Sequence, residues 1–147
     1  MAQQFKDQYA RLGINDEVPT DPIQKAEVIY QAACRKLSLN PEDMPDVSRV
    51  RGKYRASQLS FHKLEIIRDA IVGDREAKWN DYAEYKWGSW FYLNSPGFRF
   101  VDSYYSCTNA VSGAGSRLCT FSKNDQDFFA IECIALWAEF HGGVLPE

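Results

Sequence analysis

A short glycine-rich loop that ends in a cation is the first place where this sequence could do chemistry. Residues 113–117 read Gly-Ala-Gly-Ser-Arg, and strand-favouring residues follow. Backbone N–H groups in such a loop can surround an anion. The loops that bind phosphate most strongly lead into a helix, whose dipole adds to the attraction, and this loop leads into a strand. We therefore interpret Gly115, Ser116 and Arg117 as a candidate anion-binding site, with a plain turn as the alternative.

Arg117 also has a purely structural interpretation. The carboxylates of Asp125 and Asp127 follow at the start of the last predicted helix. An ion pair from Arg117 to either one would hold that helix against the sheet, and structural ion pairs outnumber functional ones. The functional and the structural interpretation of Arg117 both stay open at this point.

Other candidate nucleophiles and bases carry no catalytic signature. Ser112 and Ser116 stand beside glycines, outside any Gly-x-Ser-x-Gly elbow. The carboxylates between residues 69 and 84 flank a helix end and a polar loop, where solvation accounts for them. His62 lies alone on a predicted helix, where a histidine is more often structural than catalytic. The sequence therefore predicts no catalytic residue.

Cysteine usage and net charge argue against several classes of site. The four cysteines form no Cys-x-x-Cys pair, and with two histidines they match no zinc spacing, so we expect no metal and no cofactor. Cys34 and Cys133 fall on apolar helix faces, which is typical of reduced thiols in a cytosol. A net charge of −3 argues against a nucleic-acid partner. The basic residues between Arg49 and Arg55 are more typical of a solvated helix start.

Aromatic residues are concentrated in one stretch of the chain. Ten lie within residues 82–105: Tyr82, Tyr85, Trp87, Trp90, Phe91, Tyr92, Phe98, Phe100, Tyr104 and Tyr105. On a strand that includes Trp87, this residue shares one face with Phe91, whereas Trp90 and Tyr92 lie on the other. A strand that is apolar on both faces is covered on both, and a small sheet with few helices covers only one. We interpret Trp87, Trp90 and Tyr92 as candidate binding residues, with core packing as the alternative.

The predicted elements begin with two helices. Asp21-Pro22 is a favourable helix start, and an apolar stripe continues to Leu37. A second helix extends from about Val50 to Val72 and ends at Gly73. Residues 1–20 form either a flexible segment or a short first helix, so the single domain is drawn over residues 21–147.

Strands and a final helix complete the prediction. Two strand-like runs separated by the Pro-Gly turn at residues 94–97 indicate a β-hairpin, and residues 117–121 indicate a third strand. Ser122 is a favourable start for a last helix that is apolar nearly all round as far as Phe140. The predicted fold class is α+β, with two N-terminal helices, a small antiparallel sheet of three or four strands and a buried C-terminal helix.

An ordered set of short motifs resembles a known family. The motifs are Leu39–Ser48, Lys63-Leu-Glu-Ile-Ile67, Lys86-Trp-Gly-Ser-Trp-Phe91, Gly97-Phe-x-Phe100 and Gly115-Ser-Arg-Leu-Cys-x-Phe-Ser122. Across residues 36–140 the sequence is similar to a family of uncharacterised proteins from gut Bacteroidota, their prophages and phages. Its closing helix differs, because Phe129–Ile134 places apolar residues where the family has polar ones. The resemblance implies a phage or prophage origin and no particular activity.

Three functional hypotheses follow. The leading one is a phage- or prophage-associated, non-enzymatic binding protein in the host cytoplasm, which engages a host or phage protein or a small anionic ligand through the aromatic sheet and the Gly-Ser-Arg loop. The second is a virion structural protein that assembles through apolar faces into a homo-oligomer. The third is a nucleotide-directed enzyme, with Arg117 as anion binder and His62 or a carboxylate as base. The sequence shows no signal-peptide core and no run long enough to cross a membrane.

Overall fold

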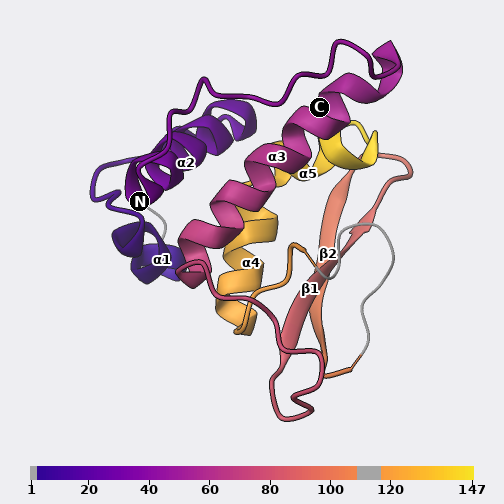
Figure 1. The fold of residues 1–147 in the computed structure, drawn as a ribbon. Helices are drawn as coiled ribbons and strands as arrows, with labels where there is room; N and C mark the ends of the chain where they lie inside the picture. Colours follow the sequence, from indigo (N-terminus) through magenta and orange to yellow (C-terminus); the bar gives the residue numbers. More distant parts are fainter. Residues whose placement is uncertain (1–2, 109–116) are drawn as a thin grey trace.

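The computed structural model describes residues 3–108 and 117–147 as an α+β fold (Figure 1). Its elements are a 3-10 helix at Gln3–Phe5, α1 (Lys6–Arg11), α2 (Pro22–Leu37), α3 (Gly52–Val72), β1 (Lys86–Tyr92), β2 (Arg99–Ser106), α4 (Lys123–Glu132) and α5 (Ile134–His141). Figure 1 shows the helices gathered on one side and the two strands along the other. Within the described residues, no helix is both long and apolar enough to cross a membrane.

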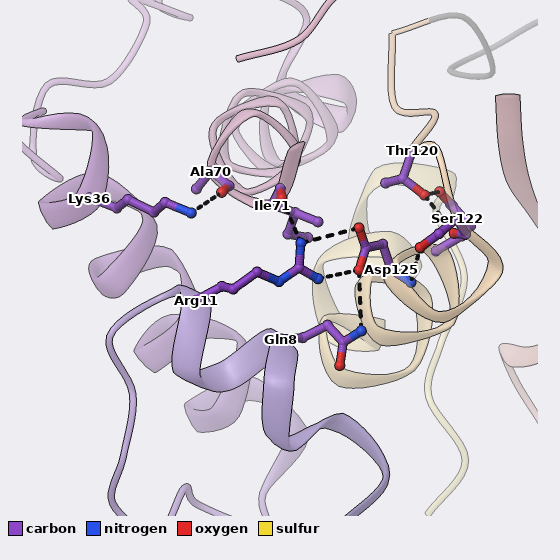
Figure 2. A network of polar contacts seen from close by, with 9 residues as sticks. Gln8, Arg11, Lys36, Ala70, Ile71, Thr120, Ser122 and Asp125 are labelled. Carbon is purple, nitrogen blue, oxygen red and sulfur yellow. Dashed lines mark hydrogen bonds and ion pairs between the residues drawn. The ribbon is translucent and has the colours of Figure 1, made fainter. Parts of the chain in front are cut away.

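Local signals place α2 and α3 close to where the sequence predicts them. The Asp21 carboxylate accepts the Gln24 N–H at 2.9 Å and satisfies one of the unpaired donors of the first turn. Gly73 adopts the left-handed conformation that ends α3, with φ at 69°. The Lys36 ammonium of α2 donates to the Ala70 carbonyl of α3 at 2.7 Å (Figure 2). This bond satisfies a carbonyl of the last turn of α3 and ties the two helices together.

The N-terminal segment packs into the core. Of the two alternatives for this segment, the structure shows the helix within residues 3–20: Phe5 and Tyr9 are buried, and both rings meet Phe128 edge-on, with centroids 5.6 and 5.1 Å apart. Figure 2 shows Gln8 and Arg11 of α1 both donating to the Asp125 carboxylate. The segment is therefore fixed to α4 by aromatic contacts and by charge.

The sheet is smaller than predicted. Within the described residues it has two antiparallel strands, β1 and β2, so the prediction of three or four strands is wrong for this part of the chain. The predicted third strand is reduced to one bridge, in which Trp87 and Thr120 exchange backbone bonds of 2.8 and 3.1 Å. The chain cannot extend the pairing beyond Phe121, because Ser122 already caps α4 by accepting the Asp125 N–H.

The predicted C-terminal helix is divided in two. Cys133 leaves the helical conformation, with φ at −106° and ψ at 23°, and separates α4 from α5. The Trp137 indole N–H of α5 donates to the Phe129 carbonyl of α4 at 3.1 Å. Phe128, Phe129 and Cys133 are fully buried and Trp137 nearly so, which agrees with the predicted burial of this region.

Candidate functional site

The two faces of the hairpin have different surroundings. On one face, Ser89 Oγ accepts from the Gln126 amide at 2.9 Å, and Ser103 Oγ donates to the Asp127 carboxylate at 2.6 Å. Both partners belong to α4, so this inner face packs against the helical layer. Phe91 lies on the same face by strand alternation and contacts Trp137 of α5, with ring centroids 5.2 Å apart. Around Ser89, Phe91 and Ser103 the inner face is therefore covered by α4 and α5.

The outer face carries an exposed aromatic group. Trp90 and Tyr92 point away from α4 by the same alternation, and their side chains are 53% and 52% exposed. The Trp90 ring packs against Tyr104 of β2, with centroids 5.2 Å apart. The Arg99 guanidinium lies 5.1 Å from the centre of the Tyr92 ring. We call Trp90, Tyr92, Arg99 and Tyr104 the outer aromatic face.

Two contacts fix the outer aromatic face in place. Gly88 lies opposite Tyr104, and a Cβ atom at Gly88 would stand 3.0 Å from the Tyr104 hydroxyl oxygen, so the glycine makes room for the ring. Burial against the strand raises the pKa of Tyr104. Arg99 donates to the carbonyls of Asn94 and Gly97 at 3.3 and 3.0 Å, which anchors its guanidinium to the hairpin turn. The exposed rings are thus held by the strands and by the turn.

Trp87 contributes to a different feature, an open hollow of about 590 Å³ at the base of the hairpin. The hollow is lined by Arg75, Asp81, Ala83, Glu84, Tyr85, Trp87 and Phe121. The Arg75 guanidinium lies 3.8 Å from the centre of the Phe121 ring and donates to Glu84 at 2.6 Å. The Tyr85 ring stacks on Tyr105 at 4.4 Å. Arg75 is the cation that lines the hollow. Its side chain is 51% exposed and is held by Phe121 and Glu84.

A buried ammonium organises the loop beside this hollow. Lys86 is 3% exposed, and its ammonium donates to the carbonyls of Asp81, Glu84 and Cys107 at 2.9–3.1 Å. The Trp79 ring centre lies 5.2 Å from the ammonium. Burial alone would raise the pKa of Glu84, but the Lys78 N–H, the bond from Arg75 and the charge of Lys86 together lower it. Glu84 therefore stays ionised and tied to this loop.

The three candidate aromatic residues lie on two faces of the hairpin, as the strand alternation predicts. Trp87 lies on the inner face at the base, whereas Trp90 and Tyr92 lie on the outer face. Gly115 and Ser116 lie outside the described residues. Arg117 is 68% exposed, and its ion-pair partner is Glu65 of α3 at 3.9 Å. The Asp125 and Asp127 carboxylates instead bind Arg11 and Lys123.

His62 has surroundings that the sequence did not predict. Its Nε2 atom is buried without a hydrogen-bond partner in the described part of the chain. His62 precedes Glu65, the partner of Arg117, by one helical turn. Neither His62 nor Arg117 lines the hollow at Trp87. Among residues 3–108 and 117–147, no His, Cys, Asp or Glu cluster is suited to hold a metal ion.

Sequence reasoning missed Gly88, Arg99 and Tyr104 as parts of the outer aromatic face. A glycine inside a strand pattern is itself a signal that another group approaches closely, and Gly88 carries that signal. Arg99 and Tyr104 carry none, because their placement depends on the register of β2 against β1. Comparison of the chain with protein-family models, with curated proteins and with solved structures finds no match.

Proposed function

We propose that this protein is a non-enzymatic binding module that docks a partner protein on the outer aromatic face. The observation that carries the proposal is that Trp90 and Tyr92 are half exposed, side by side, on the sheet face turned away from the helices. Large aromatic side chains left in water at fixed positions are costly unless a partner covers them.

The composition of this face suits a protein surface. Trp, Tyr and Arg are the residue types that contribute most at protein interfaces. Tyr104, seated over Gly88, packs against the Trp90 ring, and the hairpin turn holds Arg99, so little side-chain freedom remains to be lost on binding. An open sheet face also differs from the concave sites that small molecules occupy.

A phage or prophage setting, with a host or phage protein as partner in the host cytoplasm, stays a prediction from the family resemblance. A second copy of this chain is the alternative occupant, as a self-assembling virion component would require. Both occupants use the same face, and the mass of the complex tells them apart.

Native mass spectrometry of protein purified gently from bacterial cells tests the proposal. The wild-type chain should carry a second polypeptide, and a Trp90→Ala/Tyr92→Ala variant should be a bare monomer. Tyr82→Ala is the matched control, because Tyr82 is 71% exposed and lies outside the outer aromatic face. A complex that survives in the double variant, or a bare wild-type monomer, would contradict the proposal.

A further inference from the structure

A second hollow lies in the helical layer, away from the hairpin. It has a volume of about 730 Å³, within the range of small-molecule sites. It is lined by Ile23, Gln24, Ala26, Glu27, Lys63, Ala135, Leu136, Ala138, Glu139, Gly143, Val144 and Leu145. The start of α2, one side of α5, Lys63 of α3 and the C-terminal segment therefore form its walls. We call it the α2–α5 groove.

Small side chains create the groove. Ala26 and Ala138 are buried at its floor, 2% and 3% exposed, and Ala135 lies in its wall. Larger residues at these positions would fill the space between α2 and α5. At the rim, Ile23 and Val144 are 68% and 77% exposed, so two large aliphatic side chains stand in water beside an apolar hollow. Such a surface gains free energy when an aliphatic group covers it.

The charges at the rim leave one carboxylate without a cation. Lys63 pairs with Glu27 at 3.4 Å, and its ammonium also lies 4.9 Å from the centre of the Tyr30 ring. Glu139 accepts the Ser60 hydroxyl, and no ion pair joins it to a cation of the described residues. The groove thus combines apolar walls with a single uncompensated negative charge.

We infer that the α2–α5 groove binds a small aliphatic amine. The alkyl chain would lie along Ile23, the alanines and Val144, and the ammonium would pair with Glu139. An aliphatic carboxylate would meet the Glu139 charge instead, and Lys63 is already neutralised by Glu27. The inference concerns a site separate from the outer aromatic face, and it stands or falls independently of the proposed function.

Displacement of a neutral fluorescent probe, N-phenyl-1-naphthylamine, by three ten-carbon competitors at neutral pH tests the inference. Decylamine should displace the probe at about a threefold lower concentration than decanol, as expected for one exposed ion pair. Decanoate should be the weakest competitor. No probe binding, or equal potency of the three competitors, would overturn the inference.

Two kinds of variant distinguish the contribution of the Glu139 charge to amine binding from that of the apolar walls. Glu139→Gln keeps an acceptor for the Ser60 hydroxyl. In this variant decylamine and decanol should displace the probe at about the same concentration, and the concentration of decanol required should equal that for the wild type. Ala135→Leu should weaken all competitors, whereas Ala56→Leu, the same change at an exposed site on α3, should not. If Ala135→Leu unfolds the protein, Ile23→Ser at the exposed rim replaces it. Unchanged amine preference in Glu139→Gln, or unchanged decanol binding in the groove variants, would refute the site.

Discussion

Trp90 packs against Tyr104 across the hairpin, with ring centroids 5.2 Å apart and ring planes 44° apart, on the face turned away from α4. One residue further along β1, Phe91 points the opposite way and stacks on Phe98 at 4.7 Å. Trp90 therefore lies on the exposed face and Phe91 packs into the core, so alanine substitutions at the two positions should differ in their effect on stability.

Trp90→Ala should lower the free energy of unfolding by less than about 1 kcal/mol, because half of the side chain is already in water. Phe91→Ala should lower it by about 2–4 kcal/mol, because that ring contacts the core residues Phe98 and Trp137. Urea unfolding followed by circular dichroism measures both. Equal losses for the two variants would make Trp90 a structural residue.

Lys86→Met should destabilise the protein by about 3 kcal/mol. The substitution leaves three carbonyls without their shared donor and removes a cation 3.6 Å from the buried Glu84 carboxylate. Lys78→Met is the matched control, because the Lys78 side chain is exposed, and it should change the free energy of unfolding by less than about 0.5 kcal/mol. Thermal and urea unfolding of both variants measure the difference. A Lys86→Met variant as stable as its control would rule out this role of the ammonium.

Tyr9→Phe tests one polar contact between the N-terminal segment and α4. The Tyr9 hydroxyl donates to the buried Glu132 carboxylate at 2.8 Å, and Glu132 also pairs with Lys25 at 3.3 Å. Burial, and then the bond to Glu132, raise the pKa of Tyr9, so the hydroxyl stays protonated. Its removal should cost about 1–2 kcal/mol in the free energy of unfolding. No measurable change by urea unfolding would mean that the bond from the Tyr9 hydroxyl to Glu132 contributes little to stability.

Stability should decrease as the pH falls below about 6.5, in part because of His141. The residue is exposed at its edge, but partial burial of the imidazole lowers the pKa of His141 in the folded state below its ordinary 6.5. The imidazole lies among the rings of Phe91, Phe98, Trp137 and Phe140. The unfolded chain therefore binds a proton at a higher pH, and the free energy of unfolding falls between pH 6.5 and the folded-state pKa.

His141→Gln removes this titrating group. The variant should show a flatter dependence of the free energy of unfolding on pH than the wild type over the range from pH 7.5 to 5. Urea unfolding at several pH values gives both curves. Parallel curves for the two proteins would exclude His141 as a source of the slope.

Local signals in the sequence predicted the features that depend on a few neighbouring residues. Asp21-Pro22 and Gly73 mark helix ends, and they do so in the structure. The strand alternation that separates Trp90 and Tyr92 from Phe91 also follows from neighbouring residues. Each of these features rests on backbone geometry that one turn of helix or one strand determines.

Features that depend on distant partners could not be predicted in the same way. Thr120 forms one bridge to Trp87 in place of a strand, because Ser122 already caps α4 two residues later. A bulge after Trp90 places Phe100 opposite Phe91, and this shift sets where Arg99 lies. Arg75 reaches the hollow from a loop and carries no pattern that predicts its place.

Photo-crosslinking from position 92 tests the central claim most directly. With p-benzoylphenylalanine in place of Tyr92, irradiation of bacterial cells should give one discrete product that contains a second polypeptide, and adding Trp90→Ala should abolish it. The same group at Tyr54, an exposed aromatic position on α3, should give no such product. Absence of a product from position 92, or the same products from both positions, would contradict the assignment of the outer aromatic face as a docking surface.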